Sequence, residues 1–340
     1  YLDTGTMMPE DGVDQLEGQL GRLIGQVMGE GGLYAPTLAA LAVKQAQGDT
    51  AEAAFLLRAY RSTLERWGLT VPVAGEAMFT TRRVSPAYKD VPGGQLLGGT
   101  KDYTQRLLDF DLLSDAGEDP TAEWVTEAGD VTRLRDVLEL LRAEGLVHDP
   151  APSEEPPVDT TRTTISHPAP RSAILQELAR GETGAVTALG YSELRGYGQV
   201  HPTLGEVRSG ELPVCIEHPY TGETVEVLRT VVTETECVVP IYAKRDDAQF
   251  AFGYGLVYGR NERKAIAMSI LDAATQLSGD AAAHSAEFIL DVIDGIDSFG
   301  FIEHLKLPHY VTFQSILDRI RELRRRQGRA RSDVGDDADA

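Results

Sequence analysis

Two histidines in the segment HLKLPHY, His304 and His309, lie five positions apart, with a proline directly before the second. Histidines on one helical face recur every three or four residues, so this spacing predicts a turn. A turn can aim two imidazoles at one metal ion, but zinc takes four ligands and the neighbouring sequence supplies no further set. Cys215, Cys237 or a partner chain could complete such a site. A catalytic pair and two unrelated core histidines are the alternatives, and spacing alone favours the unrelated pair.

The segment 88–110, YKDVPGGQLLGGTKDYTQRLLDF, combines paired glycines with basic residues. It differs from a nucleotide-binding P-loop, because Thr100 precedes Lys101 and no apolar strand comes before it. Its glycines still permit close backbone approach to an anion, although a purely structural turn fits these residues equally well. The residues predicted here to bind an anionic substrate are Arg82, Lys89, Gly93, Gly94, Lys101 and Arg106.

The segment FGYGLVYGRNERK places three glycines between a predicted strand and a helix that begins near Asn261. Exposed N–H groups and the helix dipole favour an anion at such a helix start. The glycine spacing and the lack of a following acidic residue differ from a dinucleotide fingerprint. Arg263 and Lys264 are the predicted binding residues.

A third segment, RGYGQVHPTLGEVRSG, is predicted to be a loop that brings together a proton-transfer group, an aromatic ring and cations. A plain connection is the alternative. The candidates are His201 for proton transfer and Arg195, Tyr197 and Arg208 for substrate binding.

In the strand-like segment TETEC, Glu234 and Glu236 alternate onto one face, where they could share a cation or a proton. The alternative is the solvated face of an edge strand. Together with Asp90 and His201, these two glutamates are the predicted catalytic residues.

The chain has 340 residues and a net charge of −21, which argues against broad binding to a nucleic-acid backbone. Its two cysteines are too few for a disulfide framework, a four-cysteine zinc site or an iron–sulfur cluster within the chain. The sequence contains neither a long apolar run nor a secretion signal, so we expect a cytoplasmic protein without a membrane segment.

Helical periodicity dominates the first 148 residues, and strand-like segments begin near 211, 224 and 249. Further helices are predicted near 262–277, 285–297 and 312–326. We found no regular alternation of strands and helices, so the predicted class is α+β. The predicted division is a mainly helical region over 1–148, a proline-rich linker over 149–165, an α+β region over 166–328 and a disordered acidic tail over 329–340.

Several long segments together resemble one protein family. In chain order they include the segment 88–110, RGYGQVHPTLGEVRSG, GYGLVYGRNERKAIAM and HLKLPHYVTFQ. They follow one another in the same order as in the PhnI subunit of the bacterial carbon–phosphorus lyase core complex. The resemblance covers about residues 15–325. The opening YLDTGTMMPE departs from the family pattern, which places a Gly-Gly-Glu turn before the first helix.

The resemblance implies an enzyme of phosphonate catabolism that displaces adenine from Mg-ATP with a phosphonate, giving ribose 1-methylphosphonate 5-triphosphate. It also implies nucleosidase activity of the isolated subunit on ATP or GTP. The implied partners are PhnG, PhnH and PhnJ; PhnJ carries the iron–sulfur cluster and shares a zinc ion bound by His304 and His309. The competing hypotheses are a non-catalytic scaffold that positions PhnJ and a nucleoside hydrolase that works without partners.

Overall fold

The computed structural model describes residues 12–336 apart from 92, 99–101, 103–106, 109, 111–136, 152, 154, 198–200, 242–247 and 278. The contacts divide the chain into two compact units, Tyr1–Ile296 and Asp297–Ala340. This division differs from the one predicted at 149–165, because strands from both sides of that segment join one sheet. Each unit is described by itself below.

Four helices open the first unit: α1 (Gly12–Gln19), α2 (Gly21–Gly31), α3 (Pro36–Gln45) and α4 (Thr50–Ser62). The Asp49 side chain caps α4 by accepting hydrogen bonds from the N–H groups of Ala51 and Glu52. The buried faces of α2, α3 and α4 form one apolar cluster around Val27 and Leu57. The helical periodicity of this region therefore correctly predicted helices that pack against one another in the core.

The centre of the first unit is a five-stranded mixed sheet in the order β1-β3-β4-β5-β2. Its strands are β1 (Phe79–Val84), β2 (Val147–His148), β3 (Thr203–Glu217), β4 (Thr224–Ile241) and β5 (Gln249–Tyr258). The pairings β1–β3, β3–β4 and β4–β5 are antiparallel, whereas β2 runs parallel to β5. This combination of mixed sheet and separate helices confirms the predicted α+β class.

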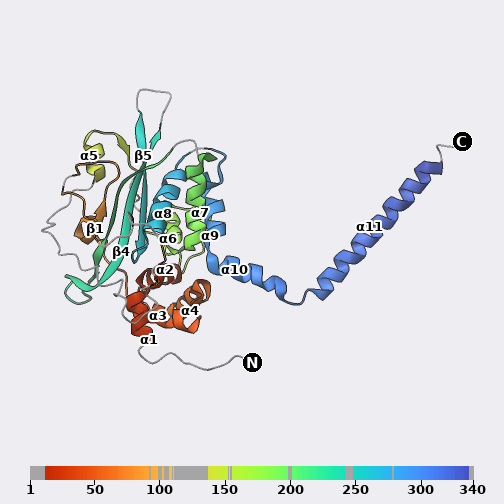
Figure 1. The fold of residues 1–340 in the computed structure, drawn as a ribbon, viewed down its shortest axis with the longest axis horizontal. Coiled ribbons are helices and arrows are strands. Elements are labelled where there is room, and N and C mark those ends of the chain that lie inside the picture. Colours follow the sequence, from red (N-terminus) through yellow and green to blue (C-terminus); the bar gives the residue numbers. More distant parts are fainter. Residues whose placement is uncertain are drawn as a thin grey trace. The chain divides into compact units, whose positions relative to one another are not determined.

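Figure 1 shows helices α6 (Arg171–Arg180), α7 (Thr183–Ser192), α8 (Glu262–Ala274) and α9 (Ala286–Ile293) together on one side of the sheet. They enclose the largest apolar cluster, which includes Leu178, Met268, Leu271 and Ile289. Cys237 of β4 lies in a neighbouring cluster beneath α8, and its thiol donates to the carbonyl of Ser269. α5 (Val137–Ala143) packs against the sheet through Leu138.

Two short elements connect the sheet to other parts of the first unit. A 3-10 turn, η1 (Gly75–Ala77), precedes β1, and a π-helix, η4 (Glu193–Tyr197), continues α7 toward β3. The prediction of a loop over 195–210 is wrong from Thr203 onward, because Thr203–Gly210 forms the first half of β3. Its alternating charged and apolar residues pair with β4 along their whole length.

The second unit contains most of α10 (Gly295–Glu303), the turn η6 (His304–Lys306) and the long helix α11 (Tyr310–Asp336). The α11 backbone is helical as far as Asp336, within the segment 329–340 that was predicted to be a disordered tail, and residues 337–340 lie outside the described part of the chain. Among the described residues, no helix is both long and apolar enough to cross a membrane.

Candidate functional site

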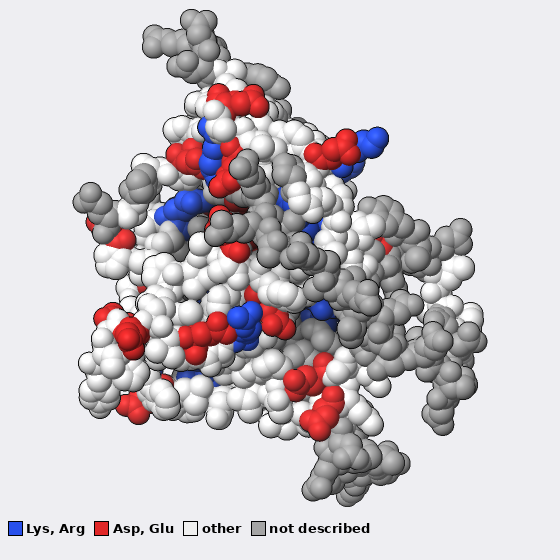
Figure 2. All heavy atoms as spheres, turned by 90° about the vertical axis from the view of Figure 1, so that its left-hand side faces the viewer, with Lys and Arg blue, Asp and Glu red and all other residues white. Residues whose placement is uncertain are grey.

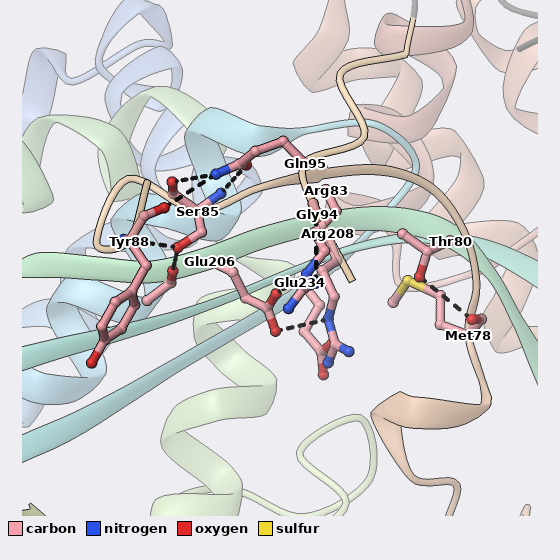
Figure 3. Close-up of polar contacts among 11 residues, drawn as sticks. Met78, Thr80, Arg83, Ser85, Tyr88, Gly94, Gln95, Glu206, Arg208 and Glu234 are labelled. Atoms are coloured by element: carbon pink, nitrogen blue, oxygen red, sulfur yellow. Dashed lines mark hydrogen bonds and ion pairs between the residues drawn. The ribbon is translucent and has the colours of Figure 1, made fainter. Parts of the chain in front are cut away.

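A ladder of buried charged side chains crosses three strands of the sheet: Arg83 on β1, Glu206 and Arg208 on β3, and Glu234 on β4 (Figure 3). Arg83 Nε lies 2.5 Å from Glu206 Oε2, and Arg208 Nε lies 3.6 Å from Glu206 Oε1. Arg208 also forms an ion pair with Glu234. Each of these four residues is at most 5% exposed, so their charges compensate one another inside the protein.

The strand register explains why these residues meet. β3 and β4 are antiparallel, with Arg208 opposite Glu234 and Glu206 opposite Glu236. Because β4 lies between β3 and β5, both predicted catalytic glutamates are central and buried. The alternative interpretation of TETEC as the solvated face of an edge strand is therefore wrong.

Tyr254 and Gly75 complete the surroundings of Glu234. The Tyr254 hydroxyl on β5 donates to Glu234 Oε1 at 2.7 Å, and burial together with the charge of Glu234 raises the pKa of Tyr254 well above its usual value. A Cβ at position 75 would lie 2.7 Å from Glu234 Oε1 and 3.0 Å from Arg208 Nη2. Glycine therefore lets η1 lie directly against the ion pair.

Together with Glu236, which lies opposite Glu206, the ladder carries one more acid than base. Glu206, Glu234 and Glu236 give three carboxylates, and Arg83 and Arg208 give two guanidinium groups, so full ionisation leaves a charge of −1. Burial disfavours the charge of Arg208, but Glu234, Glu206 and Glu236 outweigh that effect and raise its pKa. Clustered buried carboxylates of this kind can hold or transfer a proton.

The glycine-rich segment after β1 folds back onto the same ladder. Arg83 and Leu96 exchange backbone hydrogen bonds, and Arg83 Nη1 donates to the carbonyl of Gly94 at 3.4 Å. Gly93 and Gly94 have φ values of 84° and 76°, a conformation that favours glycine. Gly94 therefore adjoins Arg83 of the ladder.

The Ser85 hydroxyl donates to the carbonyl of Gly205 at 2.7 Å, and the Gln95 side chain bonds to the backbone of Ser85 (Figure 3). The first contact fixes the segment against β3, and the second closes the segment on itself. Lys89 and Asp90 are exposed beyond it. Lys101 and Arg106 lie outside the described residues.

Arg82, on the other face of β1, forms ion pairs with Asp102 and with Glu262 in the first turn of α8. Burial works against its charge, but Glu262 and Asp102 raise its pKa overall. Its guanidinium is therefore already engaged by two carboxylates, and it links the glycine-rich segment to α8.

The residues predicted to bind an anion before α8 do not all lie at the start of that helix. Asn261 caps the helix by accepting from the Lys264 N–H at 3.3 Å, and Arg263 is exposed. Half-buried Arg260 lies near Arg22, and burial followed by that neighbouring positive charge lowers its pKa. Two arginines at a helix N-terminus provide a favourable environment for an anion.

Lys264 points away from this helix start. Its side chain is 1% exposed, its Nζ donates to the carbonyl of Ala179 at 2.7 Å, and burial lowers its pKa to about 8 despite the nearby Glu30. Gly253 and Gly255 are also structural, because a Cβ at either position would lie within 2.2 Å of a backbone oxygen of α8. These residues pack β5 and α6 against α8 rather than face a ligand.

His201, Arg195 and Tyr197 lie around the junction of η4 and β3. His201 is exposed and its Nδ1 lies 2.7 Å from the carbonyl oxygen of Pro202. The exposed Arg195 lies over the ring of Tyr191 at 6.0 Å. The backbone of Tyr197 ends η4, and its side chain lies outside the described residues. No contact joins these residues to the ladder among the described parts of the chain.

In the second unit, the rings of His304 and His309 have their centroids 5.4 Å apart and are tilted by 59° to each other. The Nδ1 atom of His304 bonds to the carbonyl of Phe301, and that of His309 lies 2.6 Å from the carbonyl of Leu307. A carbonyl at Nδ1 fixes the tautomer that leaves Nε2 as the metal-binding nitrogen. Two imidazoles on one tetrahedral zinc have centroids roughly 5 Å apart, so the separation of this pair matches that of two zinc ligands. No group of three or more metal-binding side chains occurs among the residues that the structure describes.

Comparison with known proteins identifies the family. The family described as bacterial phosphonate metabolism protein (PhnI) matches residues 2–327. The chain belongs to the PhnI family. A PhnI protein of Rhizobium meliloti, named alpha-D-ribose 1-methylphosphonate 5-triphosphate synthase subunit, is 46% identical over 96% of this chain and 89% of its own length.

Two further relatives have similar names. The subunit PhnI of Escherichia coli, with the same synthase name, is 45% identical over 95% of this chain and 92% of its own length. A putative C-P lyase subunit protein, HtxH, of Stutzerimonas stutzeri is 47% identical over 90% of this chain and 85% of its own length. This chain is therefore a PhnI-family protein of phosphonate metabolism, and the site above belongs to a PhnI fold.

The sequence interpretation missed Tyr254 and Gly75, and it assigned no catalytic or binding role to Arg83 or Glu206. A usable signal existed for Glu206, because Glu206 and Arg208 alternate on β3 as Glu234 and Glu236 do on β4, and the two segments follow each other along the chain. Two adjacent charged strand faces predict cross-strand pairs. Nothing local marks Gly75, whose role depends on where η1 lies relative to β3 and β4.

Proposed function

We propose that this chain is the subunit that forms ribose 1-methylphosphonate 5-triphosphate, by displacing adenine from Mg-ATP with a phosphonate at the anomeric carbon. The observation that carries the proposal is 45–46% identity over at least 95% of the chain to two proteins named as subunits of that synthase. We include in the proposal a cytoplasmic location and nucleosidase activity of the isolated chain on ATP or GTP.

The chemistry sets two demands on the site. The transition state resembles an oxocarbenium ion, which nearby carboxylates stabilise, and the departing base must gain a proton. Buried Glu234 and Glu236 suit the first demand, and a protonated member of the acidic ladder, His201 or Asp90 suits the second. Arg260, Arg263 and Arg195 supply cations for the triphosphate and the phosphonate.

Glu234→Gln tests the role of the ladder while preserving the hydrogen bond from Tyr254. The assembled complex is given Mg-ATP and methylphosphonate, and free adenine is measured by chromatography. We expect kcat to fall by about 100-fold or more while assembly is retained. Glu226→Gln is the matched control, because Glu226 is exposed on the same strand and pairs with Arg229 only three residues away.

Normal adenine release by Glu234→Gln would exclude this carboxylate from catalysis. His201→Ala is the second variant, and we expect it to lower adenine release more than assembly. Full release by both variants, with a normal wild-type rate, would favour the competing hypothesis of a scaffold subunit.

We also propose that His304 and His309 provide two ligands of a zinc ion whose other ligands come from the PhnJ subunit, in a complex that also contains PhnG and PhnH. The support is the ring separation of 5.4 Å and the carbonyl contact at each Nδ1. With four protein ligands, zinc would fix the geometry of the interface, and with an open position it would act as a Lewis acid. Metal analysis separates the alternatives, since full zinc occupancy of the isolated chain would overturn a shared site.

A further inference from the structure

Helix α11 carries a stripe of exposed apolar side chains along one face. Phe313, Ile316, Ile320 and Leu323 are 58%, 50%, 49% and 51% exposed. Their spacing is three, four and three residues, so they lie on one side of the helix over about three turns. Every side chain of α11 that the structure describes is exposed or half-buried, so this stripe has no packing partner within the second unit.

The spacing of the stripe indicates what could cover it. Apolar residues that alternate at three and four positions form the seam of a two-helix coiled coil, in which each side chain enters a gap between residues of the facing helix. A sheet or a flat surface does not require this period. The fitting partner is therefore a helix with a matching apolar seam.

Two arginines beside the stripe favour a partner helix with negatively charged side chains at its edges. Arg319 and Arg324 flank the stripe on opposite sides, one residue from Ile320 and Leu323 respectively. Among the described residues, neither arginine has a hydrogen bond or an ion pair. By contrast, Arg321 and Arg325 lie farther round the helix and pair within it, with Asp318 at 3.6 Å and with Glu322 at 3.4 Å. The unpaired cations are those beside the seam.

These positions disfavour a second copy of the chain as the occupant. In a parallel, in-register pair of α11 helices, the residue five positions after Arg319 on the second helix faces it, and that residue is Arg324. An antiparallel pair that keeps the four stripe residues together would place Arg319 near Arg319 of the other copy. Both arrangements bring like charges together beside the seam, which is destabilising.

We propose that α11 docks against a helix of another protein subunit, which has an apolar seam flanked by Asp or Glu residues. This inference rests on the proposed function, because it requires that the chain work within a hetero-oligomeric complex. The stripe begins four residues after His309, so docking would also place the partner protein next to the histidine pair.

The test uses the full chain and the remaining core subunits, with the affinity of assembly measured at low and at high salt. Arg319→Glu/Arg324→Glu should weaken assembly by about tenfold or more at low salt, with a smaller loss at high salt. Ile316→Ser/Ile320→Ser should weaken it by about 100-fold or more at both salt concentrations. Arg321→Glu/Arg325→Glu is the matched control, with the same charge change on the same helix, and should stay within about threefold of wild type.

The control also loses both ion pairs within the helix, so weakening caused by poorer helix formation would appear in it at least as strongly. Equal affinity for all the variants and the wild type would overturn the docking face while leaving the proposed function intact. Failure of the wild-type chain to assemble would overturn both. Dimers of the chain alone that the stripe variants dissociate would replace the proposed partner with a second copy. Slow amide exchange throughout α11 in the isolated chain would show that the chain covers its own stripe, which also overturns the proposal.

Discussion

Replacing Arg208 with methionine is the most direct perturbation of the charged ladder. The substitution keeps a long unbranched side chain but removes the guanidinium that lies 3.6 Å from Glu206 and pairs with Glu234. At 3.6 Å and an effective dielectric constant of about 20, one such attraction is worth about 5 kcal/mol before desolvation is counted. Because removal of one partner strands a buried charge, we expect the free energy of unfolding to fall by about 3–5 kcal/mol.

Unfolding by urea at pH 7, followed by circular dichroism, measures this loss. Arg229→Met is the matched control, since Arg229 is exposed and pairs with exposed Glu226, and it should cost less than about 1 kcal/mol. The double variant Arg208→Met/Glu234→Gln removes a stranded carboxylate together with its partner. It should therefore be more stable than the sum of the two single variants predicts, by about 1–3 kcal/mol.

Two results would refute the reasoning. A loss below about 1 kcal/mol in Arg208→Met would show that the ladder is hydrated or already neutral. Strict additivity in the double variant would show that Arg208 and Glu234 do not act as a pair.

Three further predictions concern the surrounding scaffold. The pKa of Lys264 is about 8 in the folded chain and 10.5 when exposed, so the folded state binds fewer protons than the unfolded state between these pH values. As pH rises from 8 to 10.5, the free energy of unfolding of the wild type should therefore increase by on the order of 3 kcal/mol relative to that of Lys264→Met. A difference between the two proteins that stays constant with pH in urea unfolding would refute this. Gly253→Ala should lower the free energy of unfolding by at least about 1–3 kcal/mol, because the new Cβ would lie 2.0 Å from the Ser269 backbone oxygen. Gly18→Ala is the control in the same assay: the space around Gly18 is open, so the substitution should be neutral or stabilising by up to about 1 kcal/mol. Asp49→Ala removes the cap of α4 and should cost about 1 kcal/mol, seen as a lower Tm; an unchanged Tm would contradict that role.

Local sequence patterns were sufficient for much of the first unit and for part of the site. The alternation of Glu234 and Glu236 correctly placed both on one face of a strand. Whether that strand lay at an edge or in the centre depended on β3 and β5 both pairing with it, which no local pattern shows. The burial that makes these glutamates candidates for proton transfer is therefore a tertiary property.

The glycines and the lysine before α8 show the opposite outcome. Gly253, Gly255 and Lys264 have the composition of an anion-binding loop, yet each is required by close packing with a distant segment. Glycine spacing alone does not distinguish close approach to a ligand from close approach to another backbone. Helical periodicity in α11 likewise does not distinguish a face that packs within the chain from one left exposed.

The pairing of β1 with β3 also has a consequence during synthesis of the chain. Phe79 is opposite Glu211, so a ribosome must add more than a hundred residues after β1 before its partner strand exists. At roughly 5–20 residues per second, this interval lasts on the order of ten seconds. Over that interval the strand that carries Arg83 has no partner strand to shield it, and Glu206, which neutralises that arginine, has not yet been made. Slow translation between residues 84 and 203 should therefore leave a nascent chain that depends on chaperones until the hairpin of β3 and β4 emerges.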